Sequence, residues 1–239
     1  AIGILTETFA GAGGARTFAD GIEVGGEIPN PISRMANVET IEYSFPIRYL
    51  FRRRLKDSGG AGRYRGGVGM ELAFTPHDAP DGGMHYVVSG KGAQFPMSDG
   101  LGGGYPGAPN AYVWVHNDEL DEEKKTKAQF SENFDAMPGN KEAIDWGVFP
   151  LMGDDALYVR WNGGGGYGDP LLRPTTDVQQ DVLAGLISAK YAKNVYGVVT
   201  DQSGNELDEK ASAMQRDSLL TARMTKDSGK DKNATITDA

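Results

Sequence analysis

The sequence predicts an α+β protein that is mainly β, with antiparallel strands, long glycine-rich loops and a C-terminal helical segment. Three observations predict this fold class. The 34 glycines gather in clusters that interrupt any regular element. Segments between the clusters alternate apolar and polar residues with the period of a strand. After Pro170 the period changes to that of an amphipathic helix.

The first strand is expected within residues 38–55, where apolar and basic residues alternate. The predicted apolar face holds Ile47, Tyr49, Phe51 and Leu55, with Arg53 as its one charge. The opposite face holds Arg48, Leu50, Arg52 and Arg54. Residues 58–69 follow, and they are too rich in glycine for a helix or a strand, so we expect a loop there.

The next strands surround a turn signal. Met70, Leu72 and Phe74 alternate, and the Pro-Asp-Gly-Gly run at 80–83 favours a turn, so residues 84–88 are predicted to return as the second arm of a hairpin. Residues 111–115 and 156–161 are further strand candidates. Residues 117–133 mix acids and lysines and predict an exposed charged helix or insertion.

Helices are expected after residue 170. Residues 176–179 have the form of a capping box, ahead of an apolar stripe. A second helix is predicted through 188–196, a turn at 202–205, and a third helix over 208–224. Its weak anchors would be Ala211, Met214, Leu219 and Ala222. The chain thus divides into a β-rich core portion (1–170), a helical appendix (171–225) and a flexible tail (226–239).

Composition excludes several classes of protein. The chain has no cysteine, which rules out a thiol nucleophile and a cysteine metal site. Its formal charge of −9 argues against a protein whose whole surface binds nucleic acid, although it leaves room for a local basic face. No apolar run approaches the roughly 20 residues of a membrane helix. The start carries neither an initiator methionine nor a signal peptide. We therefore expect a soluble, cytoplasmic segment from within a longer protein.

The motifs that carry chemistry are weak. No phosphate-binding loop of the P-loop type and no dinucleotide fingerprint is present. His77 and His85 flank acids across the predicted hairpin turn, so a two-histidine carboxylate metal site is conceivable, although exposed turn histidines are far more common. Lys91 lies between two glycines and could stabilise a developing oxyanion, or be a solvated loop lysine.

Basic residues gather between positions 48 and 65, where they face a single acid, Asp57. They are Arg48, Arg52, Arg53, Arg54, Lys56, Arg63 and Arg65. Such a cluster can bind a phosphate or carboxylate, or pair with the acids of another subunit. The subunit interface is favoured, because alternate arginines on a strand give an extended charged face rather than one converging pocket.

Taken together, the glycine loops are more specific than any single motif. Three runs, at 57–67, 100–107 and 163–170, resemble the hydantoinase B/oxoprolinase family in order and spacing. The segments at 181–188 and 196–199 are similar to the C-terminal helices of that family. The resemblance covers roughly residues 1–215. Residues 88–96 and the Asn37-Val38-Glu39 run look most like its acetone/acetophenone carboxylase branch.

This resemblance implies an ATP-dependent, multi-subunit enzyme. One branch of the family adds bicarbonate to an activated ketone enolate, and the other hydrolyses cyclic amides such as hydantoins and 5-oxoproline. A hydantoinase A-type subunit would bind ATP and phosphorylate the enolate or lactam oxygen, and the B-type subunit would hold a divalent metal (Mg or Mn). Family B-type subunits are about twice as long as this chain, which resembles their C-terminal half, so the metal ligands are expected in the N-terminal half, outside this chain.

The resemblance also implies where to look for site residues. Asn37 and Glu39 precede the predicted strand at a place where family members keep polar residues, and Lys91 lies in a branch-specific loop. Each of the three is also consistent with a turn or interface role. The alternative from a different functional class is a non-catalytic docking subunit that binds its partner through the arginine-rich strand.

Overall fold

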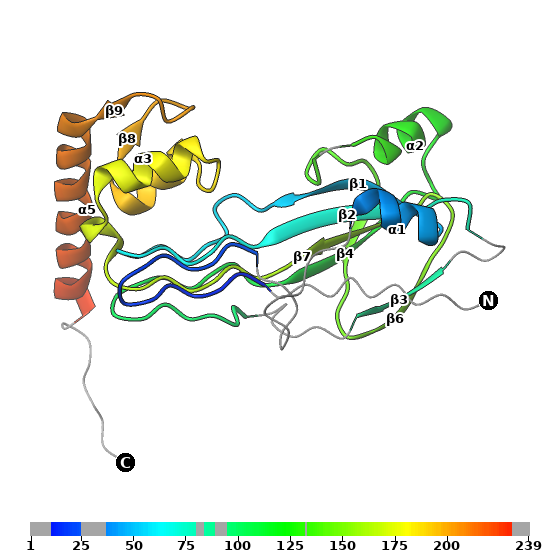
Figure 1. Cartoon of the computed structure of the whole chain (residues 1–239), viewed down its shortest axis with the longest axis horizontal. Helices are drawn as coiled ribbons and strands as arrows, with labels where there is room; N and C mark the ends of the chain where they lie inside the picture. Colours follow the sequence, from blue (N-terminus) through cyan, green and yellow to red (C-terminus); the bar gives the residue numbers. More distant parts are fainter. Residues whose placement is uncertain (1–10, 25–36, 80–83, 89–94, 132, 231–239) are drawn as a thin grey trace, which may run out of the picture.

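The computed structural model describes residues 11–24, 37–79, 84–88, 95–131 and 133–230, with side chains through Thr225. Three parts follow one another along the long axis of the molecule (Figure 1). An antiparallel sheet lies at one end, extended glycine-rich segments form the middle, and the C-terminal helices lie at the other end. The predicted class, mainly antiparallel β with a C-terminal helical segment, is confirmed.

The main sheet has five antiparallel strands in the order β1-β2-β7-β4-β5. They are β1 (Ile47–Arg54), β2 (Met70–Pro76), β7 (Ala156–Arg160), β4 (Ala111–His116) and β5 (Asn140–Ala143). The first four lie where apolar alternation predicts strands. The sequence gives no signal for β5, because all four of its residues are exposed and it has no apolar face to reveal it.

The predicted hairpin between residues 70–76 and 84–88 is wrong. Strand β3 (Met84–Val88) pairs with β6 (Gly147–Leu151), about 60 positions later in the chain, and together they form a separate two-stranded ribbon. Both edges of β2 are already occupied, by β1 and β7. The turn signal at 80–83 was therefore misleading, and it lies outside the described residues.

The expected strand over 38–55 divides into two elements. Residues 38–44 form helix α1 (Val38–Ser44), and only residues 47–54 form β1. Within β1 the register shifts between Tyr49 and Phe51, which pair with Phe74 and Ala73 respectively. This bulge at Leu50 moves Phe51 to the opposite face from Tyr49, so the predicted two-face pattern fails beyond Tyr49.

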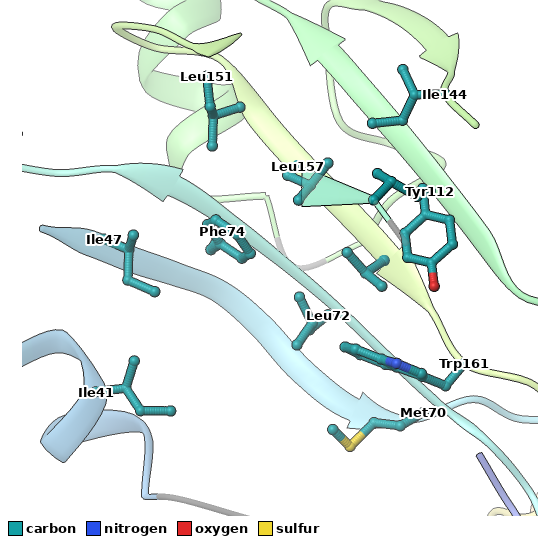
Figure 2. Close-up of a cluster of buried hydrophobic side chains, with 12 residues drawn as sticks. Ile41, Ile47, Met70, Leu72, Phe74, Tyr112, Ile144, Leu151, Leu157 and Trp161 are labelled. Atoms are coloured by element: carbon teal, nitrogen blue, oxygen red, sulfur yellow. The ribbon is translucent and has the colours of Figure 1, made fainter. Parts of the chain in front are cut away.

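Each face of the sheet covers a hydrophobic core. The first core lies between the sheet, α1 and the β3–β6 ribbon, and Figure 2 shows Ile41 of α1 with Ile47 and Phe74 of the sheet. Val88 and Leu151 bring the ribbon into the same core. On the other face, Ala73, Val115 and Tyr158 pack with residues that follow helix α2 (Glu122–Gln129). Helix α2 is the exposed charged helix that the composition predicts.

The glycine-rich segments are ordered by backbone hydrogen bonds between neighbouring stretches. Gly60 donates to Gly164, Gly164 donates to Gly67, and Gly67 donates to Gly13, with N–O distances of 2.8, 3.0 and 3.0 Å. These stretches lie so close that a methyl group does not fit between them: a Cβ at Gly66 would lie 1.9 Å from the Gly164 carbonyl oxygen. Close backbone approach therefore explains the clustering of glycine here.

The C-terminal part begins with a 3-10 turn, η1 (Pro170–Leu172), and helix α3 (Thr175–Leu183). The predicted capping box is wrong, because α3 starts before Thr176 and its N-cap, Pro174, makes no side-chain cap. Then follow α4 (Ala189–Tyr191), the π-helical turn η2 (Ala192–Tyr196), the short strands β8 (Val199–Thr200) and β9 (Leu207–Asp208), and α5 (Glu209–Lys230). Val178, Ile187 and Tyr196 form the core of this part.

Two of the four predicted apolar anchors of the long helix α5 are exposed. Met214 is 67% exposed and Ala222 is exposed, whereas Ser212 is buried. Instead, Arg216 donates to the carbonyl oxygens of Tyr196 and Arg173, at 3.1 and 2.6 Å. Polar contacts therefore hold much of α5 in place. In the described part of the chain, no helix is both long and apolar enough to cross a bilayer.

Candidate functional site

Asn37 and Glu39 lie at the N-terminal end of α1. The Asn37 side-chain oxygen accepts a hydrogen bond from the Glu39 backbone N–H at 2.8 Å, so Asn37 is the N-cap of the helix. Glu39 is exposed in the first turn, where its negative charge is favoured by the helix dipole. Both residues therefore have a structural role that sequence patterning did not anticipate, because a strand was expected to follow them.

The position of α1 is fixed from two sides. Ile41 is buried in the first core, and the Glu42 carboxylate accepts a hydrogen bond from the Tyr49 backbone N–H at 2.7 Å. Lys91 lies outside the described residues. Val88, three positions before it, is only 1% exposed and belongs to the same core as Ile41. The structure thus anchors α1 and the residue that leads into the Lys91 segment in one core.

We expect the Asn37→Ala substitution to destabilise the protein by about 1 kcal/mol, because it removes the N-cap of α1. Asn37→Asp retains a capping oxygen, so its free energy of unfolding should stay within about 0.5 kcal/mol of the parent. Urea unfolding measures both changes. Equal losses in the two variants would show that capping is not what Asn37 contributes.

The described residues do not form the metal site that the hairpin suggested, and Asp81, one of its acids, lies outside them. His85 lies on β3 opposite Pro150 of β6, and His77 is 56% exposed, 3.7 Å from the carboxylate of the adjacent Asp78. His116 lies 3.1 Å from Glu142, and its ring lies tilted against that of Trp114, with the ring centroids 4.3 Å apart. Among the described residues, no group of three or more histidine or acidic side chains is placed to hold a metal ion.

The arginine-rich segment is not one exposed face. Arg53 pairs with the Glu71 carboxylate at 2.7 Å, and Arg48 lies over the Phe130 ring. Arg65 is only 2% exposed. The expectation of a single extended charged face is therefore wrong for Arg53 and Arg65, which are engaged within this chain.

Arg65 belongs to an ion cluster made of Asp20, Glu23, Arg65, Arg173 and Asp181, here called the buried ion cluster because Arg65, Arg173 and Asp181 are buried, whereas Asp20 and Glu23 are partly exposed. Arg65 contacts Glu23 at 2.6 Å and Asp181 at 3.4 Å. Arg173 donates to both oxygens of Asp20, at 2.6 and 2.7 Å, and lies 2.9 Å from Asp181. Because Asp181 is on α3 whereas Asp20 and Arg65 are in glycine-rich segments, the buried ion cluster joins the helical part to the middle of the molecule.

Burial and pairing compete in the buried ion cluster. At Asp181, burial outweighs the attraction of Arg65 and Arg173, so the pKa of this carboxyl is raised. At Asp20, burial is outweighed by the hydrogen bonds and charges of Arg173 and Arg65, so its pKa is lowered from 3.8. Asp20 therefore adds stability above pH 3.8 that is lost as the pH falls through its folded pKa, and Asp181 has the opposite pH dependence.

Sequence reasoning missed the buried ion cluster. Asp20 and Arg173 are 153 positions apart, and neither is part of a motif. No short-range pattern could have paired them. The two arginines of the buried ion cluster offset two of its three carboxylates, and their contacts join the helical part to the middle of the molecule.

An open pocket lies between β8, β9 and the start of α5. Asp201, Glu206, Asp208 and Glu209 contribute to its lining. Four acids repel a polyphosphate, so this pocket is unsuited to ATP.

Comparison with known proteins identifies the family. The model of hydantoinase B/oxoprolinase matches residues 3–170, which is most of the chain and includes the sheet and the glycine-rich middle. The chain belongs to the hydantoinase B/oxoprolinase family. The family resemblance expected from the glycine loops is therefore confirmed.

The chain is similar to subunits of several enzymes. The chain is 30% identical to the acetone carboxylase alpha subunit of Xanthobacter autotrophicus, over 92% of this chain and 30% of that protein. It is 35% identical to the caprolactamase subunit beta of Pseudomonas jessenii (75% and 28% covered). It is 29% identical to the acetophenone carboxylase delta subunit of Aromatoleum aromaticum (82% and 30% covered).

Two solved structures share the fold. Nucleotide-free acetone carboxylase matches 91% of this chain with a TM-score of 0.76 and 28% identity. The ATP-dependent caprolactamase of Pseudomonas jessenii matches 89% with a TM-score of 0.62 and 29% identity. The chain spans about 30% of the length of these relatives, which is less than the half that the resemblance suggested.

Proposed function

We propose that this chain is part of the B-type subunit of an ATP-dependent, multi-subunit ketone carboxylase, which adds bicarbonate to an activated enolate. The observation that carries the proposal is the fit to acetone carboxylase, which extends over 91% of the chain at a TM-score of 0.76. The corresponding TM-score for caprolactamase is 0.62. Similarity to both an acetone and an acetophenone carboxylase subunit supports the same branch.

In this proposal the work is divided between chains. A hydantoinase A-type subunit binds ATP and phosphorylates the enolate oxygen, and the remaining part of the B-type subunit supplies the ligands of a divalent metal, Mg or Mn. The acidic pocket at β8 and β9, which repels a polyphosphate, supports an ATP site on another chain. We infer a cytoplasmic location for the assembly, where ATP would be available as cosubstrate.

A second candidate function is ATP-dependent hydrolysis of a cyclic amide. The 35% identity to the caprolactamase subunit, the highest among the three named relatives, favours it. In that case the phosphorylated atom is the lactam oxygen. Water attacks the lactam carbon, the ring C–N bond breaks, and phosphate is released with the ring-opened amino acid. Bicarbonate dependence separates the two reactions.

We assign this chain's contribution to the substrate site to α1 and to the segment that follows Val88. Support comes from the first core, which holds both Ile41 of α1 and Val88. Asn37 and Glu39 are exposed at the free end of α1, and so are accessible to groups from the rest of the subunit. Lys91 would place a positive charge at the oxyanion that develops during enolate formation.

We expect Lys91→Met in the full assembly to lower kcat for ketone carboxylation by about 10²–10³-fold, the usual effect of removing one oxyanion donor. Lys127→Met serves as the matched control, because Lys127 is an exposed lysine on α2 whose pairing with Glu123 is solvent-exposed. Steady-state kinetics with ketone, ATP and bicarbonate provides the measurement. Unchanged turnover in Lys91→Met would remove this residue from the site.

The proposal is tested by ATP turnover of the native assembly. Acetone, acetophenone, hydantoin and caprolactam are each supplied with and without bicarbonate. ATP hydrolysis that requires both a ketone and bicarbonate supports the carboxylase. Turnover on a cyclic amide without bicarbonate would instead support the hydrolase.

A purely docking role makes a different prediction. If this chain only holds the assembly together, its omission abolishes assembly, while substitutions at Asn37, Glu39 and Lys91 leave turnover unchanged. Size-exclusion chromatography of the complex, together with the kinetics of the three variants, separates the docking role from a contribution to the substrate site.

A further inference from the structure

The β3–β6 ribbon has two faces of different burial. Side chains alternate along each strand, and Val88 and Leu151, on the inner face, are 1% and 2% exposed in the first core. Met84, Tyr86 and Phe149 also pack against this core. The inner face therefore fixes the ribbon on the sheet and directs the alternate residues outward.

The outer face is apolar although it is exposed. Val87 and Val148 lie directly opposite each other in the register and are 61% and 62% exposed. His85 and Pro150 form the next outward pair. Trp146, just before β6, is 67% exposed. An exposed cross-strand valine pair beside an exposed tryptophan is unusual for a surface in permanent contact with water.

One edge of the ribbon is also open. Within the described part of the chain, β6 pairs with β3 alone. The other edge of β6 therefore carries a row of backbone groups without a strand partner among the described residues. A two-stranded ribbon is marginal on its own, and an open apolar edge is a template for adding a further strand.

We propose that the outer face and one edge of the β3–β6 ribbon bind the part of the B-type subunit that this chain does not span, through an added extended, apolar segment. This inference rests on the proposed membership of a longer B-type subunit. Its support is the coverage of the relatives, of which about 70% of the length has no counterpart in this chain. Figure 1 shows the ribbon at the end away from α3 and α5, where it does not contact the helical part.

The chemistry of the surface favours this occupant over two others. A second copy of this chain carries the same formal charge of −9, so two copies repel each other. A separately folded subunit would leave the valine pair and the open edge exposed until it arrived, which invites aggregation. A segment of the same polypeptide covers them from the time of folding.

The test uses single cysteines, because this chain has none of its own. Val148→Cys is introduced into the full-length subunit within the native assembly and treated with a maleimide, and labelling of its peptide is followed by mass spectrometry. We expect labelling at least tenfold slower in the assembly than after unfolding in urea. Lys127→Cys on α2 serves as the control. The Lys127 side chain is 67% exposed, so we expect the assembly to slow maleimide labelling there only slightly.

The occupant is identified by cross-linking. A benzophenone maleimide on Val148→Cys is expected to cross-link to the same polypeptide, outside the region that corresponds to this chain. Cross-links to another subunit or to a second copy would overturn the proposal, as would native labelling within threefold of the unfolded rate. Val87→Cys reports on the same face if Val148→Cys does not assemble. Neither the labelling rate nor the cross-linking partner depends on the substrate. A failure of the docking proposal can therefore be distinguished from a failure of the carboxylase proposal.

Discussion

The Arg173→Met substitution is expected to lower the free energy of unfolding by about 3–5 kcal/mol, the usual cost of removing one partner from a buried ion pair. The Arg173 side chain is 4% exposed, and it lies 2.6 Å from Asp20 and 2.9 Å from Asp181. Without it, Asp181 stays buried with only the more distant Arg65 to compensate its charge. Urea unfolding, followed by circular dichroism, measures the loss.

The control for Arg173→Met is Lys127→Met. Lys127 makes a contact of similar length, 2.7 Å to Glu123, but both side chains are more than two-thirds exposed. Exposed pairs contribute little, so we expect a change of less than about 0.5 kcal/mol. Similar losses in the two variants would contradict the conclusion that burial gives the buried ion cluster its importance.

The second large effect is expected in the glycine-rich middle of the molecule. Gly66→Ala should destabilise the protein by about 3 kcal/mol or more, because the new Cβ would lie 1.9 Å from the Gly164 carbonyl oxygen. The obstacle is backbone, so no side-chain rotation can relieve the clash. The same urea titration measures this loss, and hydrogen exchange should show faster exchange of the amide of Gly164.

Gly14→Ala is the matched control, since it adds the same methyl group in the same bundle of glycine-rich segments. A Cβ at Gly14 would meet its nearest neighbour at 3.7 Å, an ordinary van der Waals contact. We expect a change within about 0.5 kcal/mol. If Gly66→Ala lowered the free energy of unfolding no more than Gly14→Ala, the result would contradict the close packing of the glycine-rich segments.

Much of the fold could be predicted because its signals are local. The alternation of Met70, Leu72 and Phe74 predicts β2, and all three side chains enter the first core. The charged composition of residues 122–129 likewise predicts an exposed helix. Such patterns show which residues within a short stretch of chain are buried, because periodicity is informative over that range.

The errors come from interactions between distant parts of the chain. The partner of β3 is β6, beyond two intervening strands and a helix, and a nearby turn signal concealed this pairing. The bulge at Leu50 reverses the faces of β1 without any glycine to mark it. The buried ion cluster joins residues up to 153 positions apart. Local propensity carries no information about such contacts.

The candidate site was predicted less completely than the fold. The glycine loops were specific enough to indicate the family, because their spacing reflects a close-packed arrangement of backbones. No comparable packing constraint marks the site residues in the sequence. Asn37 proves to cap α1, Glu39 is an exposed first-turn acid, and Lys91 lies outside the described residues, so the three remain proposals as site residues.

The most direct test of the central claim is to follow the carbon of bicarbonate. The native assembly is supplied with ATP, acetone and ¹³C-bicarbonate, and the products are examined by NMR. We expect ¹³C in the carboxyl group of a 3-oxo acid, formed only when ATP is hydrolysed. Absence of label from any product, together with ATP-dependent ring opening of caprolactam or hydantoin, would contradict the ketone carboxylase and establish the cyclic amide hydrolase.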